Sequence, residues 1–365
     1  MERGPRRESL CAPHPYPQSP SPSYGEGAGG EDKRAPRTYL WFPLSMEWRR
    51  GQGERSSAYA ASGFAPQTKN SNAFTRRDFL KTALAATALA ALQTEAPAAL
   101  KSGPNLDKLI DVNVSPGRWP LRRVRFDDTA SLAAMLRAQG VEQAWAGSFE
   151  GLLHKDIAGV NARLADECWQ HGRGLLLPFG SINPKSPDWE EDLRRCAEEH
   201  RMPGIRLYPN YHSYKLDDPA FVRLLHLAAE RRLTVQLALL MEDERMMHPL
   251  LRVEPVETAP LGALVRQTPG LRLVLLNALG KLRGAPLREL LQAGEVYVEI
   301  SMLEGVGGLE NLLDQIPVNR VLFGSYAPLF YFESARLKLK ESRLSAGQLR
   351  AIGRANAQKL LGLNR

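Results

Sequence analysis

Three side chains near the ends of short apolar runs have the chemistry of an active site. Arg206 carries a guanidinium group whose N–H donors lie in a fixed plane, which suits a carboxylate or a developing oxyanion. Glu299 is the best-placed general acid or base, and Tyr326 is placed to donate or relay a proton. We therefore predict Arg206, Glu299 and Tyr326 as catalytic residues. The competing interpretation is that Arg206 and Glu299 pair with each other and neutralise a polar interior.

Further polar residues near the ends of the same runs are candidates for binding a substrate. They are Asn113, Ser115, Tyr208, Gln236, Asn277 and Ser301, together with His248 on a following loop. Their amide, hydroxyl and imidazole groups offer hydrogen-bond donors and acceptors. Neither serine has an evident histidine partner, so a serine nucleophile is not favoured. The sequence predicts a polar pocket without a nucleophilic triad.

Eight short apolar runs must position these residues, and they alternate with amphipathic stretches. The runs are Leu109–Val114, Val141–Gly147, Gly174–Gly180, Gly204–Tyr208, Leu233–Leu239, Leu271–Asn277, Val296–Ser301 and Arg320–Ser325. The predicted helices are Asp128–Gln139, Asp156–His171, Asp188–His200, Pro219–Arg231, Pro260–Gln267, Pro286–Gln292, Gly308–Gln315 and a last helix over Ser345–Leu361. This rhythm predicts an α/β fold, a (β/α)8 or TIM barrel over residues 105–362. A doubly wound open sheet is the alternative, but no Gly-x-Gly-x-x-Gly motif follows the first run.

Alternation within the runs predicts which side chains point into the barrel. In the run 296–301, the two valines and the isoleucine share one face, and Tyr297, Glu299 and Ser301 share the other. The apolar faces fit a covering layer of helices, so the polar faces point inward. Polar residues near the carboxyl ends of the strands then define a pocket, where barrel enzymes keep their active sites.

The first hundred residues differ from the barrel in composition. Residues 1–74 are rich in Gly, Pro, Ser and Arg and lack a hydrophobic period, which predicts a disordered leader; Met46 offers an alternative start. Thr75–Lys81 resembles the twin-arginine export signal, and an alanine-rich stretch and the cleavage site Ala96–Ala98 follow it. A chance basic helix start is the alternative. We predict a signal peptide over residues 75–98, the twin-arginine translocase as a partner, and a periplasmic or secreted protein.

Charge and cysteine content exclude some classes of function. Half of the net charge of +8 lies in the first 98 residues, and no basic stripe with interleaved aromatic residues occurs, so nucleic-acid binding is not predicted. No apolar run approaches the roughly 20 residues that span a membrane. The three cysteines show no zinc-binding spacing. Free thiols at Cys168 and Cys196 are favoured over a disulfide between them.

Motifs in order along the chain resemble the amidohydrolase-related family of barrels. Leu109–Ser115 stands where that family has Ile-Asp-x-His-x-His on its first strand. Gly204–Pro209 resembles the fourth-strand motif, Leu322–Pro328 resembles the eighth-strand motif Leu-Phe-Gly-Ser-Asp-x-Pro, and Arg354–Leu361 resembles the closing helix. The resemblance extends over about Leu109–Leu361, and it implies a TIM barrel.

The residues that this family uses to bind metal do not carry over in the resemblance. The positions of its first-strand histidine pair, its fifth- and sixth-strand histidines, its eighth-strand aspartate and its bridging lysine hold, in that order, Asn113, Ser115, Ala238, Asn277, Tyr326 and Arg206. Amide, methyl and phenol groups do not suit a tight divalent site. We therefore predict no metal ligands and no cofactor, with zinc or another divalent ion as the alternative if this alignment is wrong. His212 and His248 are expected at the rim.

The resemblance implies an enzyme, and alternatives stay open. The first hypothesis is a hydrolase, or a decarboxylase or lactonase-type enzyme, that acts on a small carboxylate-bearing or aromatic substrate without the usual metal. The second is a non-catalytic ligand-binding or scaffold barrel, a pseudoenzyme. The third is a metallohydrolase with unusual ligands such as Asn277, Glu299 and His248. A small-molecule substrate is the predicted partner in the first case, and a homo-oligomer is left open.

Overall fold

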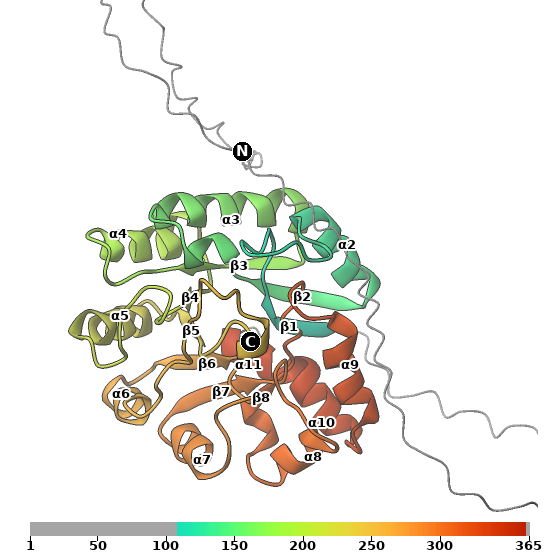
Figure 1. The fold of residues 1–365 in the computed structure, drawn as a ribbon. Coiled ribbons are helices and arrows are strands. Elements are labelled where there is room, and N and C mark those ends of the chain that lie inside the picture. Colours follow the sequence, from blue (N-terminus) through green and yellow to red (C-terminus); the bar gives the residue numbers. More distant parts are fainter. Residues whose placement is uncertain (1–107, 363–365) are drawn as a thin grey trace, which may run out of the picture. The chain divides into compact units, whose positions relative to one another are not determined.

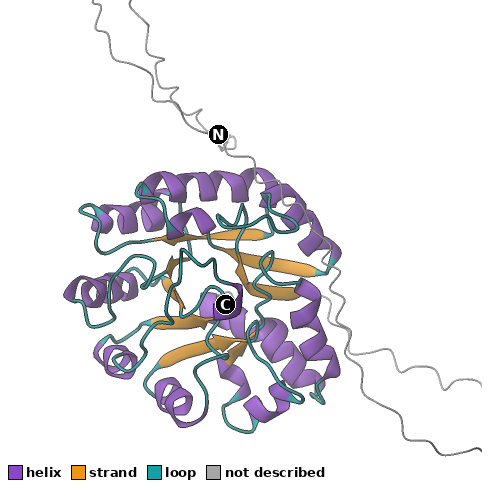
Figure 2. Ribbon diagram, viewed as in Figure 1, coloured by secondary structure: helices purple, strands orange, loops and turns teal. Residues whose placement is uncertain are grey.

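The computed structural model describes residues 108–362, which form a ring of strands surrounded by helices (Figures 1 and 2). Residues 1–107 and 363–365 lie outside the described part of the chain. The predicted leader, the signal peptide, and the start of the barrel at residue 105 therefore stay predictions.

The eight strands lie in the sheet in the same order as in the sequence, and each pairs in parallel with the next. They are β1 (Leu109–Val114), β2 (Val141–Ala146), β3 (Leu176–Ser181), β4 (Gly204–Leu207), β5 (Thr234–Ala238), β6 (Arg272–Leu276), β7 (Glu295–Glu299) and β8 (Val321–Leu322). Main-chain hydrogen bonds bring the end of the sheet back to β1: Val112 N–H donates to Phe323 O at 3.0 Å, and Tyr326 N–H donates to Asn113 O at 2.8 Å. The predicted TIM barrel is confirmed.

Helices follow the strands and cover the outside of the ring (Figure 2). They are α2 (Thr129–Ala138), α3 (Ile157–Gly172), α4 (Trp189–Arg194), α5 (Pro219–Glu230), α6 (Leu261–Gln267), α7 (Gly284–Gln292), α8 (Gly308–Leu313), α9 (Phe332–Glu341), α10 (Ala346–Arg350) and α11 (Asn356–Leu361). Aspartates begin several of them: Asp128, Asp156 and Asp218 each accept a hydrogen bond from a backbone N–H of the first turn. Asp188, predicted to begin α4, makes no such side-chain bond.

Two elements differ from the prediction. Helix α9 was not predicted, because only Phe332, Ala335 and Leu339 are buried and the remaining residues are mostly charged. Strand β8 is shorter than the predicted Arg320–Ser325, since the backbone N–H of Phe323 donates to Ile352 O on the carboxy-terminal segment instead of continuing the pairing with β7.

Two apolar layers lie on either side of the sheet, as the alternation predicted. Val296 and Val298 belong to the outer layer, between strands and helices, whereas Tyr297 belongs to the inner layer inside the ring. Helix α11 lies at the centre of the ring in Figure 1, and its Leu360 joins the inner layer. Since Arg272 at the start of β6 donates to Leu360 O at 2.7 Å, α11 closes the amino ends of the strands.

Two further predictions concern membrane spans and cysteines. Within residues 108–362, no helix combines the length and the apolar character needed to cross a membrane. Cys168 and Cys196 are buried free thiols, and burial raises the pKa of each to about 12. The favoured interpretation of two free thiols agrees with the structure.

Candidate functional site

Arg206 on β4 lies buried inside the barrel and bonds to groups from three other strands. Its Nε donates to Gln236 Oε1 at 2.7 Å, and its Nη1 donates to Val114 O at 2.9 Å and to Ser115 Oγ at 3.0 Å. Its Nη2 donates to Trp145 O at 3.0 Å. All four acceptors are neutral, and burial lowers the pKa of the guanidinium. In the described part of the chain, Arg206 forms no ion pair with a carboxylate.

Glu299 at the end of β7 is the centre of a second buried group. Its Oε1 accepts from Asn277 N at 2.6 Å, from Ser301 Oγ at 2.8 Å and from Asn113 Nδ2 at 3.3 Å, and its Oε2 accepts from Ser301 N at 2.6 Å. Gly324 makes room for this carboxylate, because a Cβ there would lie 2.4 Å from Glu299 Oε2. Glu299 therefore holds the ends of β1, β6 and β7 together. The predicted alternative, an ion pair between Arg206 and Glu299, is not formed.

Asp111 on β1 is a buried carboxyl that the sequence analysis did not single out. Its Oδ1 accepts from the backbone N–H groups of Asn113 and Ser325, both at 3.0 Å, whereas its Oδ2 has no partner in residues 108–362. Burial raises the pKa of Asp111 to about 7. The signal was present in the sequence, because Asp111 stands at the aspartate of the first-strand motif.

The two predicted tyrosines are buried beside the barrel mouth, and burial raises the pKa of both. Tyr326 donates its hydroxyl to Met241 O at 2.8 Å, and Tyr208 donates to Ser148 O at 3.4 Å. Each therefore carries a neutral phenol at neutral pH. Both tyrosine hydroxyls lie with the other predicted site residues in the barrel interior. Each already donates a hydrogen bond to a main-chain carbonyl.

The two histidines expected at the rim lie in different surroundings. His248 is exposed, and its Nδ1 accepts from Leu250 N at 3.2 Å within the same loop. His212 is buried, its Nε2 donates to Gly151 O at 2.7 Å, and burial lowers its pKa. The structure thus brings together the predicted interior residues but leaves His248 apart from them.

Loops close the carboxyl end of the barrel above these residues. Arg122 on the loop after β1 pairs with Glu242 on the loop after β5, and Glu242 is only 3% exposed. Because β1 and β5 stand four places apart in a ring of eight strands, this ion pair crosses the mouth. Trp119 and Met241, on the same two loops, belong to the inner apolar layer. Neither Arg122 nor Glu242 was predicted; the density of charge in the loop 241–249 was the available signal.

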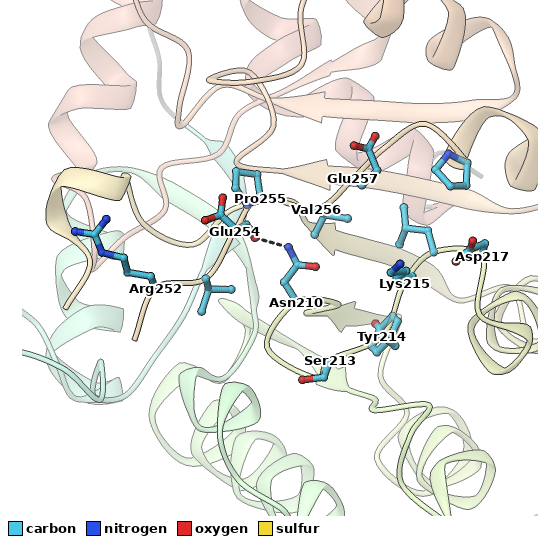
Figure 3. Close-up of a pocket in the computed structure, with 13 residues that line it drawn as sticks. Asn210, Ser213, Tyr214, Lys215, Asp217, Arg252, Glu254, Pro255, Val256 and Glu257 are labelled. Carbon is cyan, nitrogen blue, oxygen red and sulfur yellow. Dashed lines mark hydrogen bonds between the residues drawn. The ribbon is translucent and has the colours of Figure 1, made fainter. Parts of the chain in front are cut away.

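A cavity of about 630 Å³ lies between the loops that follow β4 and β5 (Figure 3). It is lined by Asn210, Ser213, Tyr214, Lys215, Leu216, Asp217, Arg252, Val253, Glu254, Pro255, Val256, Glu257 and Pro260. Asn210 joins the two loops by donating to Glu254 O, which is the dashed line in Figure 3. The predicted pocket residues do not line this cavity.

Comparison with known proteins identifies the family. The family model described as Amidohydrolase matches residues 111–363. The chain belongs to the amidohydrolase family. No match was found among curated proteins.

Solved structures of amidohydrolase-type barrels share the fold at low sequence identity. A 2,6-dihydroxybenzoate decarboxylase from Rhizobium is 15% identical, with a TM-score of 0.55, and the match covers 71% of this chain and 100% of that one. A 5-carboxyvanillate decarboxylase from Novosphingobium aromaticivorans, complexed with manganese and 4-hydroxy-3-methoxy-5-nitrobenzoic acid, is 14% identical, with a TM-score of 0.57 and coverage of 72% and 98%. A dihydroxybenzoic acid decarboxylase from Polaromonas, with bound manganese and the inhibitor 2-nitroresorcinol, is 17% identical, with a TM-score of 0.56 and coverage of 71% and 98%.

These structures contradict the prediction that no cofactor is involved. The barrels from Novosphingobium and Polaromonas contain manganese, so a divalent metal is the cofactor that the comparison indicates. The prediction was wrong because it took the cofactor from aligned ligand positions alone.

A divalent metal inside this amidohydrolase barrel would need several side-chain donors close together. Within residues 108–362, no three His, Cys, Asp or Glu side chains come together in a way that could hold a metal ion. The described interior supplies amide, hydroxyl and phenol groups and only two carboxylates, those of Asp111 and Glu299. Glu299 already accepts four hydrogen bonds, and the guanidinium of Arg206 lies in the same interior. A cation in that position repels a metal ion, and amides and phenols bind divalent ions weakly. The described donor set therefore does not fit manganese.

Proposed function

We propose that this amidohydrolase-family protein is an enzyme that acts on a small aromatic substrate bearing a carboxylate, by decarboxylation or hydrolysis, inside the carboxyl end of the barrel. The observation that carries the proposal is Arg206, a guanidinium buried without a carboxylate partner in the described residues. A buried charge is costly unless it is paired, so an anionic ligand beside Arg206 would be stabilised. The similarity to barrels that decarboxylate hydroxylated benzoates supports this choice of substrate.

The three predicted catalytic residues each have a role in this proposal. Arg206 binds the substrate carboxylate, with Ser115 and Gln236 holding the guanidinium in its plane. In a decarboxylation, the bond between the ring and the carboxylate carbon breaks, the electron pair stays on the ring carbon, and that carbon takes a proton as carbon dioxide leaves. Tyr326 is the proposed donor of that proton, because it is a neutral phenol at the mouth.

We propose that Glu299 has two roles at this site, as a base and as a positioning residue. It holds the backbone N–H of Asn277 and both donors of Ser301 in fixed places, so these polar groups face a substrate in one arrangement. Asn113 and Tyr208 complete the proposed polar lining. For a substrate to reach them, the loops joined by Arg122 and Glu242 must part.

An assay of the full-length protein against aromatic carboxylates tests the proposal. 2,6-Dihydroxybenzoate and 5-carboxyvanillate are incubated with the enzyme, with and without added manganese, and loss of substrate absorbance and release of carbon dioxide are followed. We expect turnover that falls by roughly 30-fold or more in Arg206→Lys, since lysine keeps the charge but loses the planar donors. A melting curve shows whether that variant is folded.

The result with manganese assigns the metal. Activity that appears only with manganese would mean that the reaction requires the metal. Equal activity with and without manganese would mean that side chains carry out the reaction. Absence of turnover and of 2-nitroresorcinol binding under both conditions would rule out the proposed substrate class.

A non-catalytic ligand-binding or scaffold barrel is the second candidate. The interior groups already bond to one another, and the Arg122–Glu242 pair covers them. Binding of 2-nitroresorcinol without turnover of any carboxylate would support this candidate over the enzyme.

We also propose that the protein is exported through the twin-arginine translocase, on the strength of the motif Thr75–Lys81. Replacement of both Arg76 and Arg77 by lysine should leave the protein in the cytoplasmic fraction of the cell, whereas the unchanged chain should be recovered outside it. An unchanged distribution would contradict the proposal.

A further inference from the structure

Lys338 on α9 contacts the main chain that directly follows β7. Its Nζ donates hydrogen bonds to the carbonyl oxygens of Ile300, at 2.9 Å, and of Ser301. These two residues come after Glu299, the last residue of the strand. Within residues 108–362, Lys338 and Glu299 form no ion pair. The lysine therefore meets the Glu299 group through the main chain and not through the carboxylate itself.

The peptide group between Ile300 and Ser301 joins the lysine to the carboxylate. Its carbonyl oxygen accepts from Lys338 Nζ, and its N–H, that of Ser301, donates to Glu299 Oε2 at 2.6 Å. A cation at the oxygen and an anion at the N–H polarise a peptide group in the same direction, so each hydrogen bond strengthens the other. This peptide group therefore couples the charge of Lys338 to the charge of Glu299.

The charges around the Lys338 ammonium group agree with this coupling. Burial lowers the pKa of Lys338, and the carboxylates of Glu299 and Glu304 act in the opposite direction. Glu304 is exposed on the loop after β7, so water weakens its effect, whereas Glu299 is buried. The other charged residues that line the cavity beside Lys338 are Glu310, Glu341 and Arg343.

We propose that Lys338 is a positioning residue for Glu299. It holds the peptide group that binds the carboxylate, and its positive charge stabilises the ionised form of Glu299 through that peptide group. This inference rests on the function proposed for the barrel interior, in which Glu299 is a base. The alternative is that Lys338 only joins α9 to the end of β7, a role that would not respond to the charge of Glu299.

The pH profile of turnover by the full-length protein tests the proposal. Lys338→Met keeps the unbranched stem and removes the ammonium group, whereas Lys338→Arg keeps the charge and the donors. In Lys338→Met, we expect the acidic limb of the kcat/KM profile to move to higher pH by roughly half a unit to one unit, less than a direct ion pair would give. Lys338→Arg should restore most of this shift. Neither variant should change KM much, because Lys338 does not contact the substrate.

A second measurement does not require turnover. Because coupling between two charged groups is reciprocal, Glu299→Gln should lower the pKa of Lys338. The side-chain signals of isotope-labelled lysines are followed by NMR as the pH is raised, and the Lys338 signal is assigned by its absence from Lys338→Arg. We expect its midpoint to fall by roughly half a pH unit in Glu299→Gln. Lys340, exposed on the same helix, is the control: its signal should not move in Glu299→Gln, and Lys340→Met should leave the pH profile as it was.

Two outcomes would overturn the proposal. One is a Lys338 signal that titrates at the same pH in Glu299→Gln as in the unchanged protein. The other is a pH profile that stays in place in Lys338→Met, or that shifts as far in Lys338→Arg. If no substrate is turned over, the proposed function fails, and the Lys338 signal still decides whether the lysine and Glu299 are coupled. The same signal decides if a melting curve shows that Lys338→Met is unfolded.

Discussion

The barrel interior and the cavity between the loops after β4 and β5 both carry polar groups at the carboxyl end of the sheet. The two regions differ in how far these groups are buried and hydrogen-bonded. Inside, Arg206 and Glu299 are buried and each makes several hydrogen bonds within the protein. At the cavity, Asp217 and Glu254 are exposed, and the buried Tyr214 hydroxyl has no partner in the described chain.

This difference separates buried side chains that make several hydrogen bonds within the protein from exposed charged side chains that are solvated by water. A buried polar network stabilises and fixes a structure when its members are satisfied, and removing one member leaves the others unpaired. Exposed charges contribute little to stability, because water already solvates them. Substitutions of interior polar residues should therefore lower the free energy of unfolding, and substitutions of the exposed charges at the cavity should leave it nearly unchanged.

The largest effect is expected for Arg206→Met, which keeps the volume and removes the donors. It would remove the four hydrogen bonds that the guanidinium donates to Gln236 Oε1, Ser115 Oγ, Val114 O and Trp145 O, at a cost of roughly 4 kcal/mol or more in the free energy of unfolding. Urea denaturation measures this cost. Arg245→Met is the matched control, because Arg245 is exposed and bonds only to Asp243 in its own loop; an equal loss in both variants would contradict the distinction.

Asp111→Asn should change how stability depends on pH. The pKa of Asp111 is about 7 in the folded protein and near 3.8 when unfolded, so the folded state binds the proton more tightly between these values. Stability from this group is present below about pH 4 and is lost as the pH rises to 7, by roughly 3 to 4 kcal/mol at 1.36 kcal/mol per pKa unit. Asparagine cannot lose that proton, so unfolding measured from pH 5 to 8 should show a flatter slope. An unchanged slope would mean that Asp111 is solvated in the folded state.

Arg122→Gln should loosen the barrel mouth with a smaller effect on the whole fold. The variant leaves Glu242 buried without its partner, so the loops after β1 and β5 should open more often. Hydrogen exchange in residues 115–128 and 239–258 should speed up by roughly three- to tenfold, with little change in the strands. Arg245→Gln removes an exposed pair of the loop after β5 and should leave that exchange as it was.

The smallest effect is expected for Tyr214→Phe, which should leave the free energy of unfolding within about 0.5 kcal/mol, because the lost hydroxyl has no partner. Tyr326→Phe is the comparison inside the barrel mouth. It removes a hydrogen bond to Met241 O and should cost about 1 kcal/mol. Thermal melting of the two variants compares their stabilities. A larger loss of stability in Tyr214→Phe than in Tyr326→Phe would contradict this contrast between the two regions.

The metal content of the protein is a further measurement on the barrel interior. The decarboxylase barrels from Novosphingobium and Polaromonas contain manganese, whereas the interior described for this chain holds a guanidinium among amides, hydroxyls and two carboxylates. Metal analysis of the purified protein should be made together with the activity assay, since stoichiometric manganese would require ligands outside the described arrangement.

The sequence by itself determined the barrel and which residues face into it. Apolar runs with a period of two, separated by helical stretches with aspartate at their starts, favour one arrangement strongly enough to be predicted. Arg206, Gln236 and Glu299 were assigned to the interior correctly, because strand alternation fixes the face of each side chain. The family was also identifiable, since its motifs lie in order along the chain.

Only the tertiary structure decided what those interior residues bond to. Arg206 binds carbonyl groups of residues 114 and 145, whose availability depends on how β1 and β2 pair, and no pattern of side chains announces a main-chain acceptor. Arg122 and Glu242 are 120 positions apart and meet because two loops cross the mouth. The hydroxyl of Tyr214 and Oδ2 of Asp111 are among the buried polar atoms of the described residues that have no hydrogen-bond partner. A missing partner depends on the packed surroundings of a residue, which the sequence around that residue does not contain.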